Sequence, residues 1–253
     1  SCSFSEILSE TTIDYEIITE DLEQVELIDR ASYKIIGQSM KALDIPEKVN
    51  GSGRYGIDAF VPNMLYAKII VPPTRLGSSI ISIDDSAAVN VDGYVKTLPI
   101  KFPPEALLGG FVVDVPLVIA RNYPAALRAS KLVKIEWSKS ENAKISSEDL
   151  RKDAHSLLNK KASGKSFFQV GNFQEAEAAA GLKKIEASFE TGMVAHVPLE
   201  PANAMARYAD GILHIYAGHQ AGSFLPTFIG QYVGIAPENI IFHPHLVGGG
   251  FGK

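Results

Sequence analysis

The glycine-rich loop Gly248-Gly-Gly-Phe-Gly252 constrains the fold of this chain more than any other local feature. It follows directly on the apolar stretch 240–247, whose pattern predicts a strand. Successive glycines permit positive φ angles and carry no side chains, so backbone amides can turn towards an anion or a cofactor at close range. Phe251 would then be the one side chain that projects from the loop. The competing interpretation is a flexible turn.

Two familiar nucleotide motifs do not match this loop. A dinucleotide-binding fingerprint would need a glycine at the position of Lys253. A phosphate-binding P-loop has four residues between its first glycine and the Gly-Lys pair, whereas only three separate Gly248 from Gly252. The loop therefore predicts neither of these nucleotide sites.

Strands and helices are interleaved along the rest of the chain. Apolar or alternating stretches predict strands at 64–71, 117–120, 133–137, 185–189 and 212–217. Capping residues predict helices that begin after Asn122, after Ser146 and after Asn172. Pro226 in a first turn predicts a further helix over 225–233. The pattern indicates a fold that mixes helices and sheets.

Composition excludes several classes of protein. The 253 residues are enough to bury a sizeable core in one large domain or two small ones. The 24 basic and 29 acidic side chains give a net charge of −5, which disfavours nucleic acid as a partner. No uncharged apolar run reaches the ~18 residues that a membrane span needs. The single cysteine, Cys2, excludes an internal disulfide and an iron–sulfur cluster bound by this chain alone, and its place near the terminus does not favour a reactive thiol.

The two ends of the sequence predict a fragment. The first residue is Ser1 rather than Met, and no basic stretch followed by an apolar segment precedes the fold. The last residue, Lys253, lies inside the glycine-rich loop with no element after it. The cellular compartment is not identified by these features.

The segment from His196 to Asn203 is a second candidate site. Its prolines forbid a helix, so His196 and Glu200 cannot share a helical face as zinc ligands. A proline-stiffened, extended segment could still bring a polar group to the wall of a pocket. The alternative is a histidine and a carboxylate that satisfy backbone groups within a loop.

Further polar residues lie at the ends of predicted strands. Gln220 follows Gly218 and His219 where a strand ends and a helix is about to begin, and its amide could hold an oxo group or a carbonyl. Helix capping is the competing role. His243 and His245 fall on one face of a strand, but without a visible third ligand they do not favour a metal site.

Taken in order, these segments resemble a known family. The segments His196–Asn203, Gly218–Gln220, 234–239 and Gly248–Gly252 resemble the molybdenum-binding subunit of the xanthine dehydrogenase and aldehyde oxidase family. Segments upstream are similar to the α/β hammerhead domain of that family: 44–51, 55–58, 61–67, 92–95 and 133–137. The segment 35–37, which leads towards residue 44, is most similar to the isoquinoline 1-oxidoreductase type of large subunit. The resemblance covers roughly residues 30 to 253.

The resemblance implies an α+β fold in four parts. Residues 1–43 would connect to a preceding domain, and residues 44–140 would form the hammerhead domain. A helical linker would cover residues 141–180, followed at 181–253 by the truncated first part of a mixed α/β molybdopterin-binding domain.

The resemblance also implies roles for individual residues. Phe251 and Gly252 would lie beside the oxo ligand of the metal, while Gly249 and Gly250 would let the backbone approach the molybdenum–pterin cofactor. Gln220 would hydrogen-bond the same oxo group. The pocket for the substrate would be bordered by His196 and Glu200. No residue of the chain would ligate the metal directly, and the general-base glutamate would lie beyond Lys253.

The implied reaction is hydroxylation of an aldehyde or a nitrogen heterocycle with oxygen from water. Its electrons would leave through iron–sulfur clusters on a partner subunit, and the rest of the large subunit would complete the site. The isolated chain is therefore predicted to be inactive. A parent in the periplasm and one in the cytoplasm are both compatible with this resemblance.

Two other functions stay open at this point. The first is a non-catalytic scaffold that docks a redox partner without metal. The second is a protein that binds a phosphate ligand through the glycine loop alone.

Overall fold

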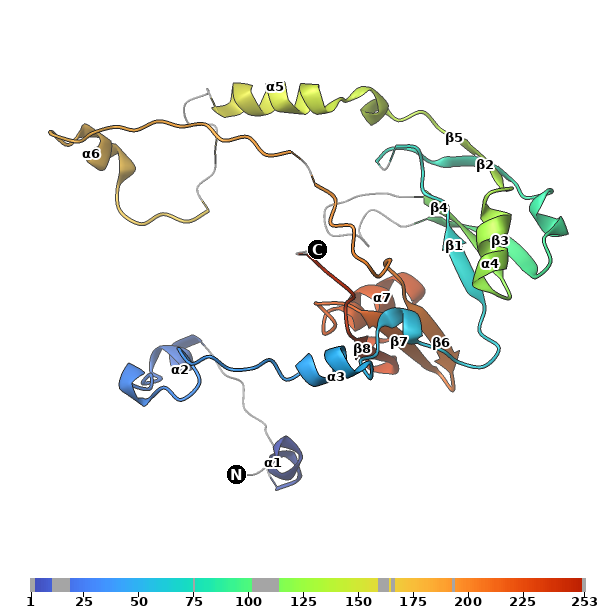
Figure 1. The fold of residues 1–253 in the computed structure, drawn as a ribbon, viewed down its shortest axis with the longest axis horizontal. Coiled ribbons are helices and arrows are strands. Elements are labelled where there is room, and N and C mark those ends of the chain that lie inside the picture. Colours follow the sequence, from blue (N-terminus) through green and yellow to red (C-terminus); the bar gives the residue numbers. More distant parts are fainter. Residues whose placement is uncertain are drawn as a thin grey trace. The chain divides into compact units, whose positions relative to one another are not determined.

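The computed structural model describes residues 3–10, 19–74, 76–101, 114–158, 164, 167–192 and 194–251. Cys2 and Gly252 lie outside this described part. The chain divides into two compact units, Ser1–Gly53 and Arg54–Lys253 (Figure 1). The boundaries of the four predicted parts, at residues 43, 140 and 180, stay predictions.

The first unit consists of short helices joined by irregular chain. These helices are α1 (Phe4–Glu10), α2 (Thr19–Glu23), η1 (Arg30–Ser32) and α3 (Ile45–Asn50). α3 ends at Gly51, whose φ of 80° is left-handed and suits glycine. None of the described side chains of this unit is buried, so the unit has no core of its own there.

The second unit contains three small sheets (Figure 1). The first sheet has the order β1-β4-β3, the second is the pair β2-β5, and the third has the order β6-β7-β8. The strands are β1 (Tyr66–Ile69), β2 (Ile80–Asp84), β3 (Tyr94–Lys101), β4 (Asp114–Ala120), β5 (Lys134–Trp137), β6 (Met205–Ala209), β7 (Ile212–Gly218) and β8 (Ile240–His245). The helices are α4 (Tyr123–Ser130), α5 (Ser147–Leu158), α6 (Phe173–Ala178) and α7 (Leu225–Val233), with single turns η2 (Gly56–Asp58), η3 (Ala88–Asn90), η5 (Glu141–Lys144) and η6 (Pro237–Asn239).

β4 and α4 form the centre of the first core. β4 pairs antiparallel with both β1 and β3, and its Val118 is completely buried. α4 presents small alanines, among them Ala125 and Ala129, which lets the helix lie close to the sheet. Asn122 caps α4 by accepting a hydrogen bond from the Ala125 amide at 2.9 Å.

The third sheet combines both strand directions. β6 pairs antiparallel with β7, and β7 pairs parallel with β8 through the crossover helix α7. Ile215, Ala217 and Ile240 are buried in this sheet. A Cβ built on Gly230 of α7 would lie 2.5 Å from the Ile235 carbonyl oxygen, so glycine permits the tight exit from the helix.

The structure confirms most predicted elements. Helices follow Asn122, Ser146 and Asn172, and α7 covers the predicted range 225–233. At α5, Ser146 and Asp149 form a capping box, in which the Asp149 amide donates to Ser146 Oγ at 3.1 Å and the Ser146 amide to the Asp149 carboxylate at 2.9 Å. The predicted mixture of helices and sheets is confirmed.

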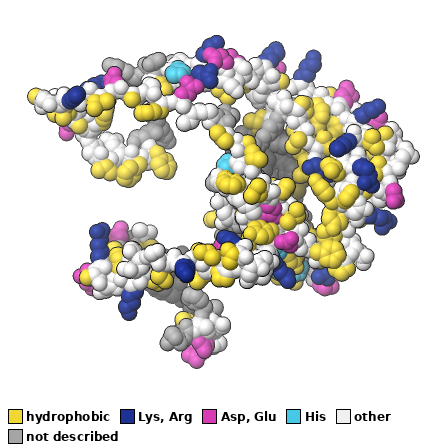
Figure 2. Space-filling model, viewed as in Figure 1, with side chains coloured by type: hydrophobic (Ala, Val, Ile, Leu, Met, Phe, Trp, Pro, Cys, Tyr) yellow, Lys and Arg dark blue, Asp and Glu magenta, His cyan; other side chains and the backbone are white. Residues whose placement is uncertain are grey.

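The strand predicted at 185–189 is wrong. Alternating apolar residues do occur there, but the segment is extended without pairing to another strand. Ile185 is 82% exposed and Phe189 is 92% exposed. Both residues belong to a stretch whose hydrophobic side chains are exposed to solvent (Figure 2). A strand needs a partner as well as a pattern, and the described part of the chain offers none to this segment.

The described helices include no candidate for a bilayer span, since none combines sufficient length with sufficient hydrophobicity.

We expect Val118→Ala to lower the free energy of unfolding by about 2 kcal/mol, because it leaves a cavity at the centre of the first core. Urea denaturation measures the change. Val89→Ala is the matched control, since Val89 is 63% exposed beside the buried Ala88. Equal losses in the two variants would contradict the placement of the core.

Candidate functional site

Two candidate segments leave the third sheet at the same edge. β7 and β8 run parallel, with Gly218 paired to His245, so the residues that follow each strand emerge side by side. A Cβ built on Gly218 would lie only 2.6 Å from the Leu246 carbonyl oxygen. Gln220 and the glycine-rich loop therefore both begin where the carboxyl ends of parallel strands meet, which is where such sheets commonly bind ligands.

The three consecutive glycines that open the loop, Gly248 to Gly250, differ in their surroundings. A Cβ on Gly248 would lie 2.4 Å from the Glu200 Cβ. Gly249 has a φ of 87°, and a Cβ there would lie 2.9 Å from the Phe251 ring. A Cβ on Gly250 would meet only Val247 Cγ1, at an ordinary 3.5 Å. Packing within the chain thus explains the first two glycines, whereas a Cβ at the third would meet no close contact in the described chain.

The backbone amides of the loop also differ. The Gly248 amide donates to Glu200 Oε2 at 2.8 Å, and the Gly249 amide donates to the Val247 carbonyl at 2.9 Å. The amides of Gly250 and Phe251 have no acceptor within the described part of the chain. The later half of the loop therefore retains two donors that a ligand could use.

Phe251 adopts a φ of 47°, unusual for a residue with a large side chain, and is 68% exposed. A residue in this region costs free energy unless its surroundings hold it there. The exposed ring and the strained backbone both belong to the loop that the sequence singled out.

Gln220 lies in an exposed turn after β7. Its side-chain amide makes no hydrogen bond to any residue that the structure describes. The capping alternative is wrong, because the N-cap residue of α7 is Phe224. The neighbouring His219 accepts a hydrogen bond from the Ala221 amide at 3.0 Å, which orders the turn.

Both oxygens of the Glu200 carboxylate accept hydrogen bonds from the chain. Oε1 accepts from the Ile57 amide at 3.0 Å and from Asn203 Nδ2 at 2.9 Å, and Oε2 accepts from the Gly248 amide. This is the arrangement described by the alternative interpretation, a carboxylate that satisfies backbone groups. His196, by contrast, is exposed four positions earlier in the sequence.

The environment of Glu200 favours its ionised form. Partial burial raises the pKa of the carboxyl, but the hydrogen bonds from Asn203 and from the amides of Ile57, Gly248 and Gly56 outweigh it. The pKa therefore lies below its ordinary value of 4.5.

Three histidines gather on one face of the third sheet. His214 Nδ1 and His243 Nε2 are 3.0 Å apart, and Tyr216 stacks on His243 with ring centroids 4.2 Å apart. His245 lies edge-on to the same tyrosine. Burial and the neighbouring His214 and His245 lower the pKa of His243.

This histidine cluster is not a metal site in the described part of the chain, where no group of three or more suitable side chains is arranged to hold an ion. The two-residue spacing predicted the shared face of His243 and His245. His214 was missed, because its proximity depends on the parallel register of β7 and β8, which sequence spacing does not show.

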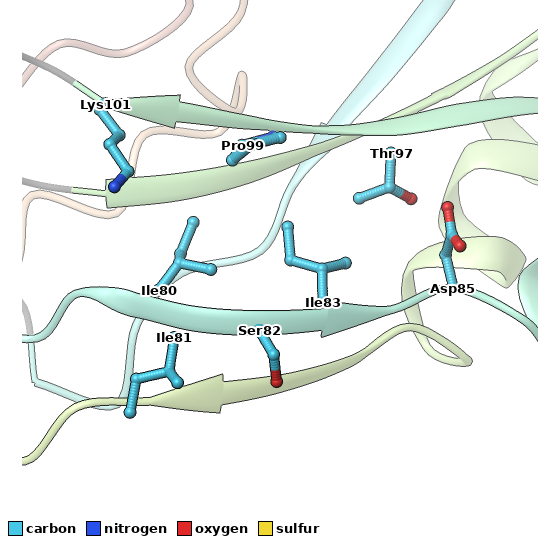
Figure 3. Close-up of a pocket in the computed structure, with 8 residues that line it drawn as sticks. All are labelled: Ile80, Ile81, Ser82, Ile83, Asp85, Thr97, Pro99 and Lys101. Atoms are coloured by element: carbon cyan, nitrogen blue, oxygen red, sulfur yellow. The ribbon is translucent and has the colours of Figure 1, made fainter.

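A groove of about 410 Å³ lies between β2 and β3 (Figure 3). Ile80 and Ile83 point from β2 towards β3, while Ile81 and Ser82 point the other way. None of the predicted site residues lines this groove. A second hollow, of about 500 Å³, is bordered by His219, Ser223 and Phe242, next to the turn that carries Gln220.

Comparison with known proteins gives a consistent family. Residues 157–253 match the model of the molybdopterin cofactor-binding domain. The chain is 29% identical over 236 residues to the isoquinoline 1-oxidoreductase subunit beta of Brevundimonas diminuta, covering 90% of this chain and 29% of that protein. It is 23% identical to the aldehyde oxidoreductase molybdenum-binding subunit of Escherichia coli K12, covering 87% of this chain and 31% of the relative. The chain is a homologue of the molybdenum-binding subunits of the xanthine dehydrogenase and aldehyde oxidase family.

One relative has a name that points to another cofactor. The chain is 34% identical over 252 residues to a protein of Gluconacetobacter polyoxogenes named membrane-bound aldehyde dehydrogenase [pyrroloquinoline-quinone]. The match covers 99% of this chain and 32% of that protein. The chain thus spans about a third of the length of each of these three relatives.

Solved structures of two oxidoreductases share the fold. The quinoline 2-oxidoreductase of Pseudomonas putida 86 superposes with a TM-score of 0.57 at 22% identity, over 85% of this chain and 31% of that one. The aldehyde oxidoreductase of Desulfovibrio desulfuricans gives a TM-score of 0.58 at 15% identity, over 84% of this chain and 27% of the other. The predicted α+β fold class is confirmed.

The loop of this homologue fits a molybdenum–pterin group. A Cβ at Gly250 would meet no close contact in the described chain, and the amides of Gly250 and Phe251 have no acceptor there, so a polar group could approach the main chain closely. The match to the molybdopterin cofactor-binding domain confirms the predicted cofactor at the level of the domain family. The individual roles of Gln220 and of the loop residues stay predictions.

Gly248→Ala should destabilise the protein by about 2 kcal/mol, since the new methyl group would overlap the Glu200 side chain. Gly192→Ala is the control, because nothing lies within 4 Å of a Cβ there. Both substitutions reduce the conformational entropy of the unfolded chain to the same extent. The difference in stability between the two variants in thermal unfolding therefore measures the effect of the overlap with Glu200. A Gly248→Ala variant as stable as Gly192→Ala would contradict the close packing.

Proposed function

We propose that this chain supplies the hammerhead domain and the first cofactor-binding segments of a molybdenum hydroxylase large subunit. The enzyme would oxidise aldehydes or nitrogen heterocycles with oxygen taken from water. One observation carries the proposal: Gln220 and the glycine-rich loop converge at the carboxyl ends of β7 and β8, inside the segment that matches the molybdopterin-binding family.

Each residue has a distinct part in this proposal. The cofactor, when bound, supplies the redox centre that takes two electrons from the substrate carbon and delivers oxygen derived from water. The amides of Gly250 and Phe251 would donate to it, Gly250 would let the backbone approach closely, and Gly249 would supply the left-handed turn that precedes these two amides. The Gln220 amide donates to an oxygen of the same group. Phe251 and Gly252 would lie next to the metal, where the phenyl ring would exclude water.

Further components complete the enzyme. The chain spans about a third of the length of its relatives, so the remaining cofactor contacts and the general-base glutamate would come from the rest of the large subunit. Iron–sulfur clusters would come from a partner subunit, since Cys2 is the single cysteine here. The relative named isoquinoline 1-oxidoreductase subunit beta supports such an assembly. The 253-residue chain by itself would be inactive.

A quinone-dependent aldehyde dehydrogenase is the second candidate. The name of the relative at 34% identity describes it as an aldehyde dehydrogenase and includes pyrroloquinoline quinone. The domain match over 157–253 favours the pterin cofactor instead.

Analysis of the bound cofactor separates the two candidates. We expect the full-length protein, purified with its partner subunits, to contain stoichiometric molybdenum by elemental mass spectrometry and a pterin by fluorescence after oxidation. Quinone without molybdenum would favour the second candidate. A protein that holds neither group would support the non-catalytic scaffold.

Gln220→Ala should lower turnover about a hundredfold in the assembled enzyme, the usual effect of losing one donor to a reacting oxygen. Folding and molybdenum content should not change, because the side chain is exposed and makes no hydrogen bond to other described residues. Gln231→Ala, on the exposed side of α7, is the matched control. Steady-state kinetics measure both, and equal activities would remove Gln220 from the site.

A further inference from the structure

The Glu200 carboxylate joins three segments that are far apart in the sequence. Ile57 lies 143 positions away and Gly248 lies 48 positions away, yet both donate their backbone amides to it. Asn203 donates its side-chain amide to the same group at 2.9 Å, and its other hydrogen bond, to the Pro201 carbonyl at 2.8 Å, fixes its orientation. Hydrogen bonds to an ionised acceptor are roughly twice as strong as neutral ones.

Glu200 holds Gly248 from both sides. Its carboxylate accepts from the Gly248 amide at 2.8 Å, and its own amide donates to the Gly248 carbonyl at 3.0 Å. The two residues are so close that a Cβ on Gly248 would overlap the Glu200 Cβ. Both backbone polar groups of Gly248 are therefore fixed by one residue.

The fixed residue is the first of the loop. Gly249 follows with a φ of 87°, and Phe251 follows with a φ of 47°. These left-handed conformations persist only where the neighbouring chain holds them. The amides of Gly250 and Phe251, which have no acceptor in the described part of the chain, lie two and three positions beyond the anchor.

We propose that Glu200 is a positioning residue for the glycine-rich loop, holding Gly248 so that the Gly250 and Phe251 amides keep one arrangement for a ligand. The role towards a molybdenum–pterin ligand rests on the proposed function, whereas the role in the loop does not. This role differs from the contact with substrate predicted for Glu200, and it rests on the hydrogen bonds that both carboxylate oxygens accept from groups of the chain.

The first test is hydrogen–deuterium exchange of the full-length protein, followed by mass spectrometry of peptides that cover residues 246–251. Glu200→Gln replaces one carboxylate oxygen with an NH₂ group, which donates hydrogen bonds. The variant side chain keeps one acceptor oxygen and cannot accept from both the Ile57 and the Gly248 amides as the carboxylate does. We expect protection of the hydrogen-bonded amides in this segment, above all that of Gly248, to fall at least about tenfold at pH 7, as the loss of a charged acceptor implies. Glu238→Gln, an exposed carboxylate of the single turn η6, is the control and should change nothing.

The pH profile distinguishes positioning by the charge from a general structural effect. The pKa of Glu200 is depressed in the fold, so its stabilisation is present above 4.5 and is lost as the pH falls through the depressed pKa. Loop protection in the wild type should therefore fall in an acid step below pH 4.5, relative to intrinsic exchange. In Glu200→Gln that step should be absent, because the loop is already released at pH 7.

The outcomes separate this inference from the proposed function. Loss of loop protection with a parallel loss of molybdenum supports both. Loss of protection in a protein that never contains molybdenum supports the positioning role and overturns the proposed cofactor. Unchanged protection and an unchanged acid step in Glu200→Gln overturn the positioning role, even if molybdenum is present. If the Glu200→Gln variant does not accumulate, the test is the fall in loop protection of the wild-type protein below pH 4.5. Loop protection that does not fall in this range would overturn the positioning role.

Discussion

The parallel pairing of β7 with β8 is the interaction on which the candidate site depends. Parallel neighbours need a crossover, and α7 supplies it within a short stretch of chain because Pro226 starts the helix and Gly230 allows its tight exit. The pairing places the ends of both strands at one edge, where the absence of a side chain at Gly218 lets the backbone pass the Leu246 carbonyl. Without that contact, Gln220 and the loop after β8 would not begin at the same place.

Three consecutive glycines suggest one common role, but in the structure each glycine is surrounded differently. Gly248 is required by Glu200, and Gly249 by its own left-handed backbone and by the Phe251 ring, whereas a Cβ at Gly250 would meet no close contact in the described chain. The sequence motif shows that these positions carry no side chain. It does not show which of them packs against another residue of the chain. The distinction matters because only an unfilled position is available to a cofactor.

Sequence patterns predicted the elements whose causes are local. Asn122 and Asn172 cap helices that begin one residue later, and each cap is a hydrogen bond to an amide two or three positions away. The strand expected at 185–189 failed because alternation describes one strand and says nothing of a partner. The contact of His214 with His243 and that of Ile57 with Glu200 depend on pairing between distant segments, so spacing could not reveal them. The residues themselves singled out the loop and Gln220. The ordered resemblance to a family assigned these residues to a cofactor, which stays a prediction, and it gave Glu200 a place beside substrate rather than within the backbone network.

The hydrogen bonds of Glu200 also bear on how the predicted hammerhead and cofactor-binding parts act together. Tyr55 forms a parallel bridge with Leu246, the Leu246 amide donates to the Arg54 carbonyl at 2.9 Å, and Ile57 donates to Glu200. The stretch that opens the predicted hammerhead thus extends the edge of β8 and helps to hold the start of the glycine-rich loop. A displacement of residues 54–57 would remove a donor from Glu200 and a neighbour from Leu246 at once. The loop geometry is therefore set by both predicted parts, and a cofactor-binding segment cut free of residues 54–57 would lose part of the support for the amides that it offers to a ligand.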